Sequence, residues 1–150
     1  MIQDVVLKKL QRNEDERGWL AEIFRADDDR YNAAMGYVSV TNPGVVRGPH
    51  EHSQQSDFFV FLGPGSFKLF LWDRRESSST KGERIEIEVG ENNPTAVLVP
   101  PGVVHGYKCV SEIPAWCINL PDKLYRGIGK QEEVDEIRWE KDPASPFKID

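Results

Sequence analysis

The sequence has few cysteines and no long hydrophobic run, and both shortages restrict where the protein acts. Only Cys109 and Cys117 occur among its 150 residues. No apolar stretch approaches the roughly 20 residues that a membrane-spanning helix needs, and residues 1–11 hold no apolar core of a secretory signal. We therefore expect a cytoplasmic protein with no membrane span, whose cysteines are small core residues.

Basic residues are in deficit as well. The chain has 19 Lys and Arg against 25 Asp and Glu, which gives a net charge of -6 at pH 7. Its basic residues are scattered, and an acidic surface repels a phosphate backbone, so the composition argues against nucleic-acid binding. Arg17, Arg25 and Arg47 could still hold a small anionic ligand.

Helical periodicity is almost absent, whereas short apolar stretches recur between glycines and prolines. We expect strands at Trp19–Arg25, Tyr37–Thr41, Phe58–Leu62, Ile85–Val89 and Thr95–Val99, a hairpin of His105–Val110 with Ala115–Leu120, and faint helical character only at Gln131–Trp139. Roughly eight or more short strands predict an all-β sandwich or barrel. We expect one domain over residues 1–150, built as a double-sheet jelly roll.

The three histidines carry the functional signal. His50 and His52 are two apart, so on a strand their side chains project to the same side. His105 follows a proline turn that leads into another apolar stretch. If the two strands face each other, all three imidazoles meet in one pocket. The alternative is that His50 and His52 are polar surface residues and His105 is a hydrogen-bonded core histidine.

Further sequence marks resemble a known family. Gly48, His50, His52, Gly63, Pro100, Gly102 and His105 resemble the two motifs of the cupin superfamily. The series Glu16-Arg17-Gly18 with Glu22, Gly44 to His50, Asp73-Arg74-Arg75 with Ser77 to Thr80, Pro101 to Tyr107, and Ile137-Arg138-Trp139 is similar to the dTDP-4-dehydrorhamnose 3,5-epimerase family. The resemblance covers most of the chain, from about Asp15 to Trp139.

The resemblance implies a cupin jelly roll, a double-stranded β-helix, that forms a homodimer and acts on a nucleotide-linked 4-keto-6-deoxy sugar. The activity is epimerisation or keto-isomerisation by proton abstraction next to the carbonyl, with no cofactor required, in dTDP-rhamnose and polysaccharide biosynthesis. His50 falls on the family's catalytic base. Arg47, Arg17 and Glu22 fall on positions that contact substrate, partly across the dimer interface. His52 and His105 are then expected to be electrophilic partners of the enolate.

The sequence also departs from the family pattern. The lysine that stabilises the enolate falls on Ser56, and the tyrosine that donates a proton falls on Ile118. The aspartate that orients the base belongs to a C-terminal segment that we expect to be missing, since the sequence ends at Asp150. His52 stands where the family usually has glutamine.

That extra imidazole supports a second hypothesis. His50, His52 and His105 together form the histidine set with which metal-binding cupins hold Zn, Ni, Fe or Mn, and such a metal would stabilise an enolate as a Lewis acid. The acidic ligand position counts to Ser56, and we expect Asp57, one residue further on, to face the other way unless the strand bulges. A third hypothesis is a non-catalytic jelly roll that binds a sugar.

Overall fold

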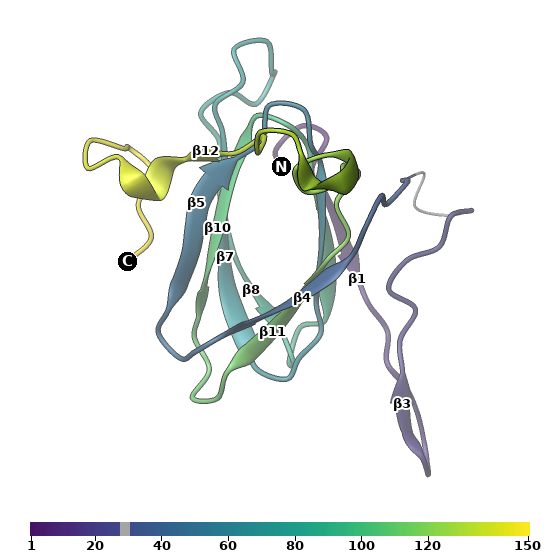
Figure 1. The fold of residues 1–150 in the computed structure, drawn as a ribbon. Coiled ribbons are helices and arrows are strands. Elements are labelled where there is room, and N and C mark those ends of the chain that lie inside the picture. The colour runs from purple at the N-terminus through teal and green to yellow at the C-terminus, as the bar shows by residue number, and fades with distance from the viewer. Residues whose placement is uncertain (28–30) are drawn as a thin grey trace.

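The computed structural model describes residues 1–27 and 31–150, and its architecture is almost entirely antiparallel β-structure. One five-stranded sheet has the order β1 (Val6–Lys9), β9 (Thr95–Val99), β6 (Asp57–Phe61), β11 (Ala115–Asn119) and β4 (Tyr37–Thr41). The other has the order β12 (Ile137–Arg138), β5 (Val46–Glu51), β10 (Val103–Cys109), β7 (Ser66–Asp73) and β8 (Arg84–Gly90). The sheets face each other, and the hairpin of β2 (Asn13–Asp15) and β3 (Gly18–Leu20) stands away from them (Figure 1). This arrangement confirms the expected all-β double-sheet fold.

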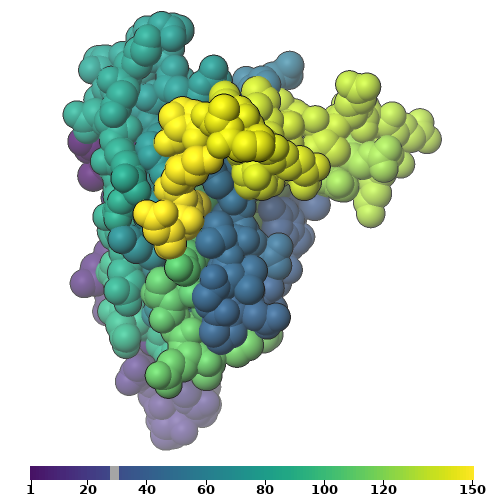
Figure 2. Space-filling view, turned by 90° about the vertical axis from the view of Figure 1, so that its left-hand side faces the viewer, coloured from purple at the N-terminus to yellow at the C-terminus, as the bar shows by residue number. Residues whose placement is uncertain are grey.

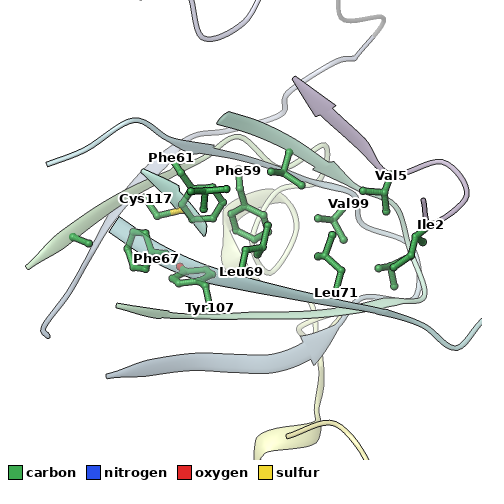
Figure 3. Packing of buried hydrophobic residues seen from close by; sticks show 14 of the residues in the cluster. Ile2, Val5, Phe59, Phe61, Phe67, Leu69, Leu71, Val99, Tyr107 and Cys117 are labelled. Carbon is green, nitrogen blue, oxygen red and sulfur yellow. The ribbon is translucent and has the colours of Figure 1, made fainter. Parts of the chain in front are cut away.

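The main core fills the space between the two sheets. Phe61 on β6 and Phe67, Leu69 and Leu71 on β7 are fully buried, and Figure 3 shows their side chains meeting between the sheets. Alternate residues of each strand point inward, so these strands contribute one apolar face to the same layer. The core occupies one part of this space and leaves the region near β4 and β5 for polar side chains.

The outer faces of both sheets are partly covered as well. Phe24 and Tyr31 pack on Phe58 over β6, which explains why the Phe58–Leu62 stretch is buried on both sides, as expected. On the other sheet, Trp139 and Phe147 pack around Trp72. Figure 2 shows the C-terminal segment lying across this face, while the yellow-green segment before β12 projects from the molecule.

Three local expectations were wrong. The stretches His105–Val110 and Ala115–Leu120 form strands but not a hairpin, because β10 pairs with β5 and β7 whereas β11 pairs with β4 and β6. The expected strand Trp19–Arg25 is restricted to β3, Gly18–Leu20. The stretch Gln131–Trp139 is not helical and contains β12; the short 3-10 helices η1 (Ile128–Lys130) and η2 (Trp139–Lys141) lie at its two sides.

Two composition-based expectations can be compared with the structure. Cys109 and Cys117 are buried and free, which confirms that they are core residues. Among the described residues, no helix is long and apolar enough to cross a membrane.

Candidate active site

A cavity of about 610 Å³ lies between the sheets at the end formed by β4 and β5. Its walls include Tyr37 and Ser39 from β4, Arg47 and His50 from β5, and Tyr107 from β10. Residues 121–140, between β11 and the C-terminal segment, line its mouth. The pocket therefore opens where the apolar core ends and polar side chains begin.

The backbone of β5 brings His50 against its neighbour strand. Gly48 has a φ of 81°, and a Cβ atom there would lie 2.8 Å from the carbonyl oxygen of His105 and 3.1 Å from Nδ1 of His50. Only glycine fits such a close approach in this conformation. His50 then pairs in register with His105, and the centroids of the two rings are 4.4 Å apart.

The three histidines converge on a buried carboxylate. Oδ2 of Asp57 lies 3.1 Å from Nε2 of His52 and 3.2 Å from Nε2 of His105. One potential ligand atom from each of His50, His52, Asp57 and His105 lies within 4.8 Å of all the others. The expected convergence of the imidazoles is present, and an acidic group completes it.

The expected orientation of Asp57 was wrong. Asp57 points into the site, whereas Ser56, the position expected to be acidic, precedes the strand. Residues 53–56 form a loop, and the backbone N–H groups of Ser53, Gln54 and Gln55 donate to the Asp135 carboxylate. Inward and outward alternation holds only along a continuous strand, so it could not be counted across this loop.

The histidines carry different charges. Burial alone lowers the pKa of His52, but the hydrogen bond and charge of Asp57, with the Asp135 carbonyl, raise it to about 8. Burial, followed by His105 and His52, lowers the pKa of His50 to about 2. At neutral pH the site therefore holds an Asp57 carboxylate, a protonated His52 and a neutral His50 with a free lone pair.

A second carboxylate lies beside His50. β12 pairs with β5, which places Arg138 opposite His50, and Oε1 of Glu136 lies 3.9 Å from Nδ1 of His50. Glu136 is held by Arg138, whose Nε donates to its other oxygen at 2.6 Å. The segment that returns over the pocket therefore places a carboxylate beside His50.

The other predicted site residues lie at different distances from this pocket. Arg47 lines it, although its Nε donates to Thr41 and one of its terminal nitrogens donates to the Val40 carbonyl. His52 lines the pocket too, whereas His105 is buried behind it. Arg17, paired with Asp15, and Glu22, paired with Arg25, do not line the pocket of their own chain; Arg17 belongs to the turn of the projecting hairpin (Figure 1).

Several pocket residues were missed by sequence reasoning. Tyr37 and Tyr107 line the cavity, and the buried Asn119 lies behind it, hydrogen-bonded to Tyr37 and Asp57. All three lie on strands that were expected, whereas Ile118, the counterpart of the family tyrosine, packs on the outer face of its sheet. Because Tyr37 pairs with Asn119 and Ser39 pairs with Cys117, these four residues share the inner face. The alternation along Tyr37–Thr41 could have identified Tyr37, had the inner face of that strand been known.

Comparisons with known proteins agree with the geometry. The sequence pattern of the family described as dTDP-4-dehydrorhamnose 3,5-epimerase matches residues 1–144. This chain belongs to that family. The match covers all of the pocket-lining residues, so the histidine cluster lies in the family's own sugar-epimerase domain.

Two curated relatives are similar along most of their length. The chain is 40% identical over 140 residues to the "Probable low-salt glycan biosynthesis epimerase Agl13" of Haloferax volcanii, covering 91% of this chain and 86% of that protein. It is 37% identical over 142 residues to the "Spore coat polysaccharide biosynthesis protein SpsL" of Bacillus subtilis, covering 93% and 91% of the two chains.

Solved structures confirm the cupin jelly roll. A dTDP sugar isomerase from Desulfovibrio desulfuricans superposes with a TM-score of 0.85 at 24% identity, over 98% of this chain and 91% of that one. The 3'-monoepimerase ChmJ from Streptomyces bikiniensis, in complex with dTDP-quinovose, gives a TM-score of 0.78 at 21% identity, over 91% and 70%. At these identities, the likeness establishes the fold.

The charge assignment predicts different titrations for two adjacent histidines. The pKa of His52 is raised from 6.5 to about 8, so the stabilisation that its proton provides is complete below about pH 6.5 and is lost as the pH rises through about 8. In NMR spectra of metal-free protein with labelled histidine, we expect one ring to titrate near pH 8 and His50 to stay neutral above about pH 5. The His52→Gln variant assigns the first signal. A His50 ring that titrates near its ordinary pKa would contradict the assignment.

Proposed function

We propose that this protein epimerises or keto-isomerises a dTDP-linked 4-keto-6-deoxy sugar by removing a proton next to the carbonyl. The observation that carries the proposal is the state of His50. Its ring faces the pocket, is neutral, and makes no hydrogen bond to any described residue, so its lone pair is free. The name of the relative Agl13, a probable glycan biosynthesis epimerase, supports the reaction, and the dTDP-quinovose bound to ChmJ supports the substrate class. They also make a non-catalytic sugar-binding role the weaker hypothesis.

The chemistry follows from the carbonyl of the substrate. Hydrogens on the carbons beside it are acidic because the carbanion is delocalised onto the carbonyl oxygen, so no cofactor is required. His50 takes the proton as general base, and Glu136, 3.9 Å from Nδ1, compensates the charge that the ring acquires. Protonated His52 supplies a positive charge near the enolate, in the place of the family's lysine.

The pocket offers basic groups to the phosphates of a nucleotide. Arg47, Lys123, Arg126 and Arg138 line the cavity, together with the acidic Glu132, Glu133, Asp135, Glu136 and Glu140, and Arg138 is paired with Glu136. Guanidinium groups bind phosphate oxygens through charge-assisted hydrogen bonds. Arg47 is already fixed by Thr41 and the Val40 carbonyl, so it offers its remaining terminal nitrogen in a set direction. We propose that these groups hold the diphosphate while the sugar reaches His50.

Hydrogen exchange tests the base. With dTDP-4-keto-6-deoxyglucose in deuterium oxide, we expect appreciable deuterium incorporation at one of the two carbons beside the carbonyl, because the family's lysine and tyrosine are absent from their usual positions. His50→Asn is expected to abolish it, a loss of about 100-fold or more. NMR of the recovered sugar measures the exchange, and dTDP-glucose, which has no keto group, is the matched control. Rapid exchange at both carbons, or exchange that survives in His50→Asn, would overturn this assignment.

A divalent metal ion, in place of the proton on His52, is a second candidate for the positive charge that stabilises the enolate. Nδ1 of His105 lies 3.0 Å from the Val103 carbonyl, and Nδ1 of His52 contacts the Asp135 carbonyl, so both rings turn Nε2 toward Asp57. Backbone carbonyls orient metal-binding histidines in this way. Nε2 of the buried His105 lies 3.2 Å from Oδ2 of Asp57 but makes no hydrogen bond of good geometry with any described residue. His50, His52, Asp57 and His105 therefore fit Zn, Ni, Fe or Mn, which would stabilise an enolate as a Lewis acid.

Metal binding is measured directly. We expect calorimetry of chelator-treated protein with Zn²⁺, Ni²⁺, Mn²⁺ and Fe²⁺ to detect binding of at least one of them well below the millimolar range. His52→Gln is expected to weaken it at least about 10-fold, because one of the nitrogen ligands is lost. Elemental analysis of protein purified without chelator shows whether the metal is present beforehand. If none of the four ions binds below the millimolar range, His52 carries a proton and no metal.

We also propose that the single-domain subunits form a homodimer in the cytoplasm. Val38 and Val40 on β4 and Trp116 on β11 form an apolar patch on the outer face of the first sheet, exposed by 52%, 45% and 45%. Trp19 and Leu20 on the projecting hairpin are exposed by 50% and 64%. Contiguous exposed apolar surface marks an interface, and a two-fold pair is the commonest closed assembly. Such a pair would let Arg17 and Glu22 act at the pocket of the partner.

Sedimentation at micromolar concentration tests the assembly. We expect the full chain to sediment as a dimer, and Val40→Glu and Leu20→Glu to shift it toward the monomer, because each variant places a charge in the proposed contact. Both side chains are already exposed, so the subunit should stay folded. Ile128→Glu, at a residue exposed by 81% outside the apolar patch, is the control. A monomeric wild type would contradict the proposal.

A further inference from the structure

The pocket contains a hydroxyl group that the mechanism above leaves unused. Tyr37 is the first residue of β4, pairs in register with Asn119 of β11, and lines the same cavity as His50. β4 belongs to one sheet and β5 to the other. Tyr37 and His50 therefore approach a bound ligand from opposite walls of the pocket.

A chain of hydrogen bonds fixes how the Tyr37 hydroxyl can act. Nδ2 of Asn119 donates to Oδ1 of Asp57 at 2.9 Å and to the hydroxyl oxygen of Tyr37 at 3.0 Å. A carboxylate only accepts hydrogen bonds, so Asp57 forces the amide nitrogen, and not the amide oxygen, toward both partners. The Tyr37 oxygen is thus an acceptor, and its own proton is left to be donated elsewhere.

Tyr107 and Tyr125 also line the pocket but are less suited to donate a proton. Tyr107 is only 5% exposed, its ring lies among Phe59, Phe61 and Phe67, and its hydroxyl is 3.2 Å from that of Ser39. Tyr125 lies on the segment that projects beyond β11, and within the described residues no hydrogen bond holds its hydroxyl. Of the three tyrosines that line the pocket, Tyr37 combines a residue that is 46% exposed with a hydroxyl whose orientation is fixed by Asn119.

We propose that Tyr37 is the catalytic residue that donates a proton to the enolate from the face opposite His50. This inference rests on the proposed function. His50 forms a bond to the proton that leaves carbon, the electron pair of that C–H bond enters the enolate, and the phenol of Tyr37 gives its proton to the same carbon from the other side. The resulting phenolate regains a proton from water in the open pocket, and His50 returns its proton to water. The carbon is inverted, and the enzyme is unchanged.

Two further observations support this role. Burial, with Asp57 nearby, raises the pKa of Tyr37 above its usual value despite the hydrogen bond from Asn119, so the phenol keeps its proton at neutral pH. Ile118, where the family's tyrosine falls, packs on the outer face of its sheet. The neighbouring strand β4 therefore supplies the donor that β11 lacks.

The test separates inversion from exchange. His50 alone can remove a proton and return a deuteron to the same face, so exchange does not need Tyr37. With dTDP-4-keto-6-deoxyglucose in deuterium oxide, we expect Tyr37→Phe to keep exchange within a few-fold of wild type while formation of the inverted sugar falls about 100-fold or more. NMR of the product measures both quantities. The variant should fold, because Asn119 keeps its bond to Asp57 and the lost hydroxyl is not in the core; circular dichroism and calorimetric binding of dTDP confirm an intact pocket.

Each other outcome overturns the inference. If Tyr37→Phe inverts the sugar as fast as wild type, or if Tyr107→Phe is the variant that loses inversion and keeps exchange, Tyr37 is not the donor and the proposed function stands. If Tyr37→Phe loses exchange together with dTDP affinity, the residue binds substrate and does not donate. If the wild type shows neither exchange nor inversion, the proposed function itself is wrong, and the role of Tyr37 falls with it.

Discussion

The buried carboxylate of Asp57 is the constraint on which the site depends. It is 1% exposed and lies on the central strand of one sheet, facing the histidines of the other. An anion in such a place is destabilising unless it is paired and hydrogen-bonded. His52 and His105 contact one of its oxygens and Asn119 the other, so both sheets contribute to its compensation. The same contacts set the charge of His52 and the direction of the Tyr37 hydroxyl.

The position of the pocket follows from how the core is distributed. Large apolar side chains fill the space between the sheets around β6 and β7, whereas β4 ends one sheet with Ser39 and Thr41 on its inner face. Apart from Tyr37, which lines the cavity, no bulky side chain on the inner face of β4 occupies that end. The chain returns there after β11 and lays Glu136 and Arg138 beside His50, so the wall is completed by a segment with little regular structure.

The sequence correctly predicted features that depend on how residues alternate along one strand. It missed features that depend on which strands pair with each other. The convergence of His50, His52 and His105 was predicted from spacing along two stretches, although His52 lies just past the end of β5. The burial of the Phe58–Leu62 stretch follows from composition. The local sequence does not determine to which sheet a strand belongs. β10 and β11 are consecutive along the chain, yet the short connection between them crosses from one sheet to the other. Asp57 was misplaced because a loop interrupted the count, and Glu136 was not identified because its segment has no period. Asp57 lies on the central strand β6 but directly after a loop, and Glu136 lies just before β12, so neither could be placed by counting along a predicted strand.

The charges of the cluster explain how a base with so low a pKa can still act. In the free enzyme a proton on His50 would lie next to protonated His52, and burial would remove its hydration, so the ring stays neutral. Proton abstraction creates the imidazolium and the enolate together, and their opposite charges attract strongly in a site of low dielectric. His50 is therefore a poor base toward water and a better one toward a carbon acid whose anion stays beside it. In the proposed mechanism, the attraction between the imidazolium and the enolate makes His50 a stronger base once substrate is bound. The lysine that the family has at the position of Ser56 is not needed for this effect.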